Sequence, residues 1–215
     1  MPDGHLSDGL WAEEDSDWRP FVALPPGHPL RAQLATLRTL TDVQFVGELL
    51  HISCRVRPDG HSMEQTFRLL SRPLVSVWHE PPRIVLVPRG SRVSTVQSSA
   101  VMHLADPVPV DERHDMVLVS LRRSSATRVG RPVLTEATFL IEAPQLIRHV
   151  CTSLRAPVRL FTFDVTLDNA PANSVELSLR PNWSSPPEVS ELQPGCHLQF
   201  TTADARPGIA EFDWT

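Results

Sequence analysis

Alternation of apolar and polar side chains is the most regular pattern along this chain. Between residues 50 and 57 the apolar positions are Leu50, Ile52, Cys54 and Val56, and the polar ones are His51, Ser53, Arg55 and Arg57. A period of two predicts a half-buried β-strand. Residues 63–70 predict its antiparallel partner, because Pro58-Asp59-Gly60 between the two runs supplies the residues of a tight turn. We therefore expect a β-hairpin here.

Nine further short runs have the composition of strands: residues 74–79, 83–87, 92–96, 116–121, 133–141, 158–167, 175–179, 197–201 and 209–214. Most are bounded by proline, glycine or serine. So many short strands separated by turns predict a mostly β fold rather than strand–helix–strand units. We expect an antiparallel β-sandwich with jelly-roll-like topology, and an immunoglobulin-like sandwich is the alternative.

Two segments have the spacing of a short helix instead. In residues 29–40 the apolar positions are Leu30, Leu34, Leu37 and Leu40, and Pro29 can occupy the first helical turn. In residues 144–154 they are Leu146, Ile147, Val150, Cys151 and Leu154. We expect two short helices, each with its apolar stripe facing the core.

Charge separates the first residues from the rest. Residues 1–18 hold six acidic residues and no arginine, so this tail carries −6 and the remainder about +1 of the total of −5. Pro25 and Pro26 before Gly27 indicate a linker. We expect a flexible acidic arm over residues 1–27 and a single β-rich domain over residues 28–215, a length that one core can support.

The composition, with 41% hydrophobic and 21% charged residues, is that of a folded globular protein. The chain has no run of about 18 apolar residues and no basic-then-apolar start, so we expect neither a membrane span, a signal peptide nor a membrane partner. Its three cysteines, Cys54, Cys151 and Cys196, are widely spaced and odd in number. This favours reduced core thiols and an intracellular, reducing compartment.

Lysine and tyrosine are both absent, so arginine supplies all 20 basic residues. Selection against ubiquitin acceptors would remove lysine alone, whereas a nucleotide bias against the codons of both residues explains the two absences together. Because such bias is common in some compact viral genomes, a viral origin is a working hypothesis, with the host cytoplasm or the virion as the location.

Candidate chemistry is sparse. The nine histidines form no zinc-finger or helical metalloprotease spacing, and His149 and Cys151 point in different directions on the expected helix. We therefore expect no metal site, no cofactor and no catalytic residue. The segment Asp111-Glu112-Arg113-His114-Asp115 places acids around an imidazole that could act as an acid or base. A solvated loop is the simpler interpretation of it.

An arginine-rich loop between two expected strands is the main candidate binding feature. Residues 121–132 contain no acid and four arginines: Arg122, Arg123, Arg128 and Arg131. Guanidinium groups bind phosphate or carboxylate oxygens in pairs, so nucleic acid, an acidic partner or the chain's own acidic arm would fit. Ser125 follows two arginines and matches a basophilic kinase site. The alternative is a solvated loop.

These observations favour a non-enzymatic structural or interaction protein, such as a viral capsid-type or accessory β-sandwich protein that associates with itself or with another protein. One alternative is an intracellular partner-binding module that uses the arginine loop and does not self-assemble. The other is an enzyme with a dispersed site, which would be favoured by His114 or His79 beside a carboxylate in a deep pocket.

Overall fold

The computed structural model describes residues 45–73, 83–122, 129–154, 158–168, 175–180, 188–193, 197–205 and 208–215. Within these ranges the structure contains strands and no helix. The strands are β1 Phe45–Val56, β2 Ser62–Pro73, β3 Arg83–Pro88, β4 Arg92–Ser98, β5 Val101–Leu104, β6 Val108–Pro109, β7 His114–Arg122, β8 Val133–Glu142, β9 His149–Leu154, β10 Val158–Leu167, β11 Val175–Arg180, β12 Glu188–Gln193, β13 His197–Ala205 and β14 Gly208–Trp214. The prediction of a mostly β fold is confirmed.

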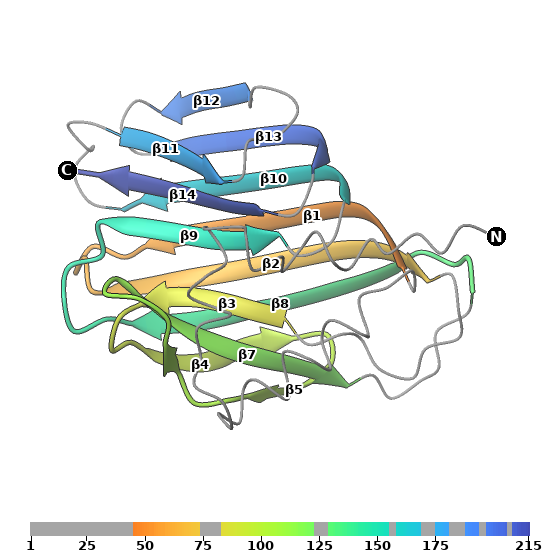
Figure 1. Cartoon of the computed structure of the whole chain (residues 1–215), viewed down its shortest axis with the longest axis horizontal. Coiled ribbons are helices and arrows are strands. Elements are labelled where there is room, and N and C mark those ends of the chain that lie inside the picture. The colour runs from red at the N-terminus through yellow and green to blue at the C-terminus, as the bar shows by residue number, and fades with distance from the viewer. Residues whose placement is uncertain are drawn as a thin grey trace.

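The strands form three sheets. The largest has the order β12-β13-β10-β1-β2-β8-β4, and the smaller ones have the orders β11-β14-β9 and β3-β7-β5, with β6 also paired to β7. The two smaller sheets lie in front of the large one in Figure 1, so the described strands form two layers. Among these strands every pairing is antiparallel except that of β1 with β10. This parallel pair departs from the expectation of a purely antiparallel fold.

The main core lies between the two layers. The alternation that predicted β1 is confirmed, because Leu50, Ile52, Cys54 and Val56 are all buried in this core. Phe163 of β10 contacts Phe212 of β14 with ring centroids 5.1 Å apart, which joins the large sheet to a smaller one. Cys54 and Cys151 are free, buried thiols, and burial raises the pKa of each. Two of the three cysteines are therefore the expected core thiols, and Cys196 lies outside the described residues.

The predicted hairpin is present as β1 and β2, with Val56 opposite Met63 at its closed end. Its turn is held by the Asp59 carboxylate, which accepts the backbone N–H groups of His61 and Ser62 at 2.8 Å each. Gly60 has a φ of 69°, a left-handed conformation that glycine adopts without strain.

The helix expected over residues 144–154 is wrong. Residues 149–154 form β9, which pairs with β14 from Gly208 opposite Leu154 to Asp213 opposite His149. The segment is too short for its apolar spacing to separate helix from strand, and its β-branched Val150 and Thr152 suit a strand that gains hydrogen bonds from a neighbour. The other expected helix, the acidic arm and the expected strand at 74–79 lie outside the described residues.

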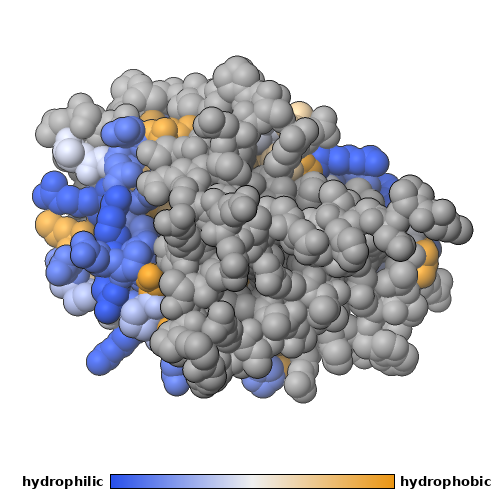
Figure 2. All heavy atoms as spheres, viewed as in Figure 1, coloured by the Kyte–Doolittle hydropathy of each residue, from blue (hydrophilic) through white to orange (hydrophobic). Residues whose placement is uncertain are grey.

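Hydrophilic side chains gather along the left edge of the space-filling view in Figure 2. The ends of β3 and β14 and the start of β9 lie at this edge in Figure 1. Across the ranges listed above, no helix is long or apolar enough to cross a membrane.

Candidate functional site

The segment Asp111-Glu112-Arg113-His114-Asp115 is an ordered turn into β7. The Asp111 carboxylate accepts the backbone N–H groups of Arg113 at 2.7 Å and of His114 at 2.6 Å. The same carboxylate lies 3.0 Å from Nδ1 of His114. His114 and Asp115 are buried, so the solvated-loop interpretation is wrong for these two residues.

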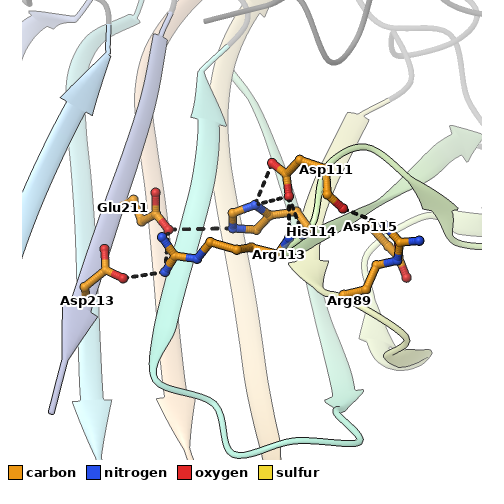
Figure 3. Close-up of polar contacts among 7 residues, drawn as sticks. All are labelled: Arg89, Asp111, Arg113, His114, Asp115, Glu211 and Asp213. Carbon is orange, nitrogen blue, oxygen red and sulfur yellow. Dashed lines mark hydrogen bonds and ion pairs between the residues drawn. The ribbon is translucent and has the colours of Figure 1, made fainter. Parts of the chain in front are cut away.

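His114 and Arg113 reach a second sheet, as Figure 3 shows. Nη2 of Arg113 donates a hydrogen bond to Asp213 and lies 3.2 Å from Oε1 of Glu211, and both acids belong to β14. Nε2 of His114 lies 3.7 Å from the same Glu211 oxygen. Glu211 is only 4% exposed, so its negative charge is held largely away from water.

His149 belongs to the same group of side chains. It pairs with Asp213 across β9 and β14, and Cys151 pairs with Glu211 two positions on. Because β9 is a strand, His149 and Cys151 point to the same face, which corrects the argument that their spacing separates them. The imidazoles of His114 and His149 meet edge to face with ring centroids 4.9 Å apart.

One potential ligand atom from each of His114, His149 and Glu211 lies within 4.8 Å of the others. Two imidazole nitrogens and a carboxylate oxygen are a donor set typical of zinc sites. We call these three residues the His–His–Glu cluster. They come from β7, β9 and β14, so only the fold brings them together.

The electrostatics of the cluster follow from burial and neighbouring charge. Burial, aided by the positive charges of Arg113 and His114, lowers the pKa of His149 to about 4, so this imidazole is neutral near pH 7. Burial acts to raise the pKa of Asp111, but the hydrogen bond and charge of His114 and two backbone N–H groups outweigh it and lower that pKa. Asp111 is therefore a carboxylate that orients His114.

Asp115 fixes the other side of the turn. Its carboxylate accepts the backbone N–H of Gly90 at 2.7 Å and lies 3.4 Å from Nε of Arg89. The guanidinium of Arg89 also donates to the carbonyl of Asp111 at 2.5 Å. Gly90 has a φ of 75°, which allows the β3–β4 turn to present its N–H to Asp115.

Sequence reasoning missed Glu211 and Asp213 altogether and set His149 aside. A signal was present, because Glu211 and Asp213 alternate with the apolar Ala210, Phe212 and Trp214 in a segment that was expected to be a strand. Such alternation places both acids on the face of the strand opposite to Ala210 and Phe212, which belong to the main core. The structure meets one part of the condition set for a dispersed site, since His114 lies beside the carboxylates of Asp111 and Glu211.

The arginine loop is described only at its margins. Arg122 is the last residue of β7, and Arg131 is exposed just before β8. Gly130 donates its backbone N–H to the carbonyl of Pro73 at 2.8 Å, which ties the end of the loop to the end of β2. Arg123, Ser125 and Arg128 lie outside the described residues.

A row of apolar side chains crosses the outer face of the seven-stranded sheet. The register places these residues opposite one another in sequence across β8, β2, β1, β10 and β13: Leu134, Leu70, Leu49, Leu160 and Ala203. We call them the leucine row. Leu134 is 52% exposed and Leu160 is 40% exposed, while Leu49 and Leu70 are partly exposed, so the row presents some apolar surface to solvent.

The rest of this outer face carries paired charges. Ion pairs join Arg55 to Asp168, Arg57 to Glu64, Arg68 to Glu136, and both Arg72 and Arg159 to Glu48.

Asp164 forms a further polar contact on this face. It accepts hydrogen bonds from the imidazole of His51 and, at 2.7 Å, from the hydroxyl of Ser53. Ser53 donates to the carboxylate and not to the histidine, so this group lacks the arrangement of an activated serine nucleophile.

No family model and no curated protein matches this chain. Among solved structures, a provisionally assigned protease from Parabacteroides distasonis is 10% identical with a TM-score of 0.48, covering 79% of this chain and 40% of that one. An M1 zinc metallopeptidase from Deinococcus radiodurans is 13% identical with a TM-score of 0.38, covering 81% and 43%. This chain thus spans less than half of each protein, and similarities this low assign no function to it.

Proposed function

We propose that this chain is a non-enzymatic structural protein that associates with a second copy of itself through the outer face of the seven-stranded sheet. The observation that carries the proposal is the leucine row, which runs across five adjacent strands with Leu134 and Leu160 exposed and Leu49 and Leu70 partly exposed. Burying these side chains against a partner would remove apolar surface from water, which stabilises the complex by about 25 cal/mol per Å² of apolar surface.

The size of the face suits a stable dimer. The five strands are 9 to 12 residues long. With strands about 4.8 Å apart and a rise of about 3.3 Å per residue, the part that all five share covers roughly 24 by 30 Å. This is about 700 Å² and comes close to the roughly 800 Å² that each partner buries in a standard interface.

The charges of the face favour an identical partner. Its arginines are already paired with acids on neighbouring strands, so the face carries both signs in near balance. Two copies can therefore approach without a large like-charge repulsion. A two-fold axis would place one leucine row against the other, because a two-fold dimer uses the same patch on both subunits.

The test is the oligomeric state of the full chain, measured by size-exclusion chromatography with light scattering over a range of concentrations. We expect wild type to associate and the double variant Leu134→Gln, Leu160→Gln to be monomeric with an unchanged circular dichroism spectrum. Leu146→Gln is the matched control, because Leu146 is also 52% exposed but lies outside the row.

A monomeric wild type at all concentrations would contradict the proposal, as would a double variant that associates as well as wild type. Closed assemblies larger than a dimer would favour the viral capsid-type subunit suggested by the composition. A dimer alone would favour an accessory role.

We also propose that the two layers form a β-sandwich of jelly-roll-like topology, with the immunoglobulin-like sandwich as the alternative. The support is the core shared between the large sheet and the two smaller ones. The parallel contact of β1 with β10 is a departure from both antiparallel arrangements.

A further inference from the structure

We propose that His114, His149 and Glu211 bind a divalent transition-metal ion, for which Zn²⁺ is the best match, where the turn into β7 meets β9 and β14. This inference is independent of the proposed self-association, because the cluster belongs to the smaller sheets and the leucine row to the outer face of the large one.

The positions of the donor atoms suit one ion. Metal–ligand bonds of about 2.0–2.1 Å place two ligands of a tetrahedral zinc ion about 3.3 Å apart. Nε2 of His114 and Oε1 of Glu211 are 3.7 Å apart, and the three donor atoms all lie within 4.8 Å of one another.

The tautomer of His114 directs a nitrogen lone pair toward the position of the proposed metal ion. Asp111 is an acceptor at Nδ1, so the neutral imidazole carries its proton there and leaves the Nε2 lone pair unprotonated. Among the described residues this buried Nε2 has no hydrogen-bond partner, although His114 is only 8% exposed. A carboxylate behind the distal nitrogen of a metal-binding histidine is the usual outer support of such a ligand.

Charge gives an independent argument. The carboxylates of Asp111, Glu211 and Asp213 lie around the cluster, with the guanidinium of Arg113 beside two of them. Carboxylates gathered in this way attract a divalent cation.

Arg113 makes the hypothesis specific, because its guanidinium lies 3.2 Å from Oε1 of Glu211 and competes with a cation for that oxygen. Replacing Arg113 by glutamine should therefore strengthen metal binding. A cluster that is only a network of ion pairs predicts no such gain. Imidazole nitrogens also favour Zn²⁺ over Mg²⁺ or Ca²⁺, which prefer oxygen ligands.

The test is titration of the purified, chelator-treated full chain with Zn²⁺ by isothermal calorimetry, and with Co²⁺ followed by its visible absorption. We expect one ion per chain, at least a hundredfold weaker binding in His114→Ala, His149→Asn and Glu211→Gln, and a loss of about 10- to 100-fold in Asp111→Asn. Arg113→Gln should bind more tightly than wild type.

Three controls keep the result interpretable. His103→Ala removes an exposed histidine outside the cluster and should bind as wild type does. Cys151→Ser should also leave binding unchanged, which separates the cluster from thiol ligation. Circular dichroism without metal checks that each variant folds.

Absence of Zn²⁺ binding in wild type overturns the proposal, as does binding that survives all three ligand substitutions in folded variants. Loss of binding in Cys151→Ser together with retention in His114→Ala would assign the ion to the cysteines instead. Because the oligomeric state is a separate measurement, either proposal can fail without the other.

Discussion

Nε2 of His114 lies 3.7 Å from Oε1 of Glu211, and this contact joins two different sheets of the front layer. Arg113 is a neighbouring cation that lies close enough to offset part of the Glu211 charge, and it also donates to Asp213. The stability of this part of the fold should therefore depend on Arg113 whenever no metal is bound.

We expect Arg113→Gln to lower the free energy of unfolding by about 1–2 kcal/mol in the presence of a chelator. The value lies below the usual cost of breaking a buried pair because Arg113 is half exposed. Urea denaturation followed by circular dichroism measures it, with the exposed Arg148→Gln as control. Added Zn²⁺ should recover most of the loss, and an equal loss in the control variant would count against a specific role.

Asp164 predicts a dependence of stability on pH. Burial acts to raise its pKa, but hydrogen bonds from His51 and Ser53 outweigh burial and lower that pKa below its usual value. The folded state therefore binds this proton less readily than the unfolded state does. The resulting stabilisation is complete above the unfolded pKa of about 3.9 and is lost as the pH falls through the lower folded value.

Asp164→Asn should thus flatten the fall in stability between about pH 5 and pH 3. Thermal or urea unfolding across this range measures the effect, and Asp106→Asn at an exposed position is the control. A steeper acid dependence in Asp164→Asn than in wild type would show that the sign is wrong.

The contact of Phe163 with Phe212 predicts how the two layers are coupled. Both rings are fully buried, and each comes from a different layer. Phe163→Ala should lower the free energy of unfolding by about 3–5 kcal/mol, because it removes a large buried side chain and leaves a cavity. A double-mutant cycle with Phe212→Ala should give a coupling of about 0.5–1.5 kcal/mol, and strict additivity would mean that the rings do not interact.

The parts of the fold that the sequence predicts well are those with local causes. The period of two in residues 50–56 and the turn at Asp59 and Gly60 predict β1, the face that β1 buries and its antiparallel partner β2. The strand at residues 158–167 was also predicted with its observed bounds as β10. Its parallel pairing with β1 was not predicted, because pairing between distant strands leaves no local pattern.

The His–His–Glu cluster shows the same limit. Three strands far apart in the sequence supply its residues, so no spacing motif exists to find. Reading residues 144–154 as a helix also placed His149 and Cys151 in different directions, which set His149 aside as a candidate ligand. The alternation of Glu211 and Asp213 with Ala210, Phe212 and Trp214 was the remaining signal.

The arginine loop gives a prediction about binding to polyanions, which is separate from self-association through the leucine row. If Arg122, Arg123, Arg128 and Arg131 bind an acidic ligand, replacing all four by serine should greatly weaken binding of a single-stranded DNA oligomer, used as a polyanionic probe. The slope of log affinity against log salt should fall by about 3 in magnitude, since each neutralised phosphate contributes about 0.7 for a single strand. Fluorescence anisotropy at several salt concentrations measures both the affinity and its salt slope.

The control for this experiment is Arg55→Ser, because that arginine is already paired with Asp168 on the outer sheet face. Equal binding by wild type and the fourfold variant would leave the loop as a solvated connection, and the tie of Gly130 to Pro73 would then serve only to anchor it beside β2.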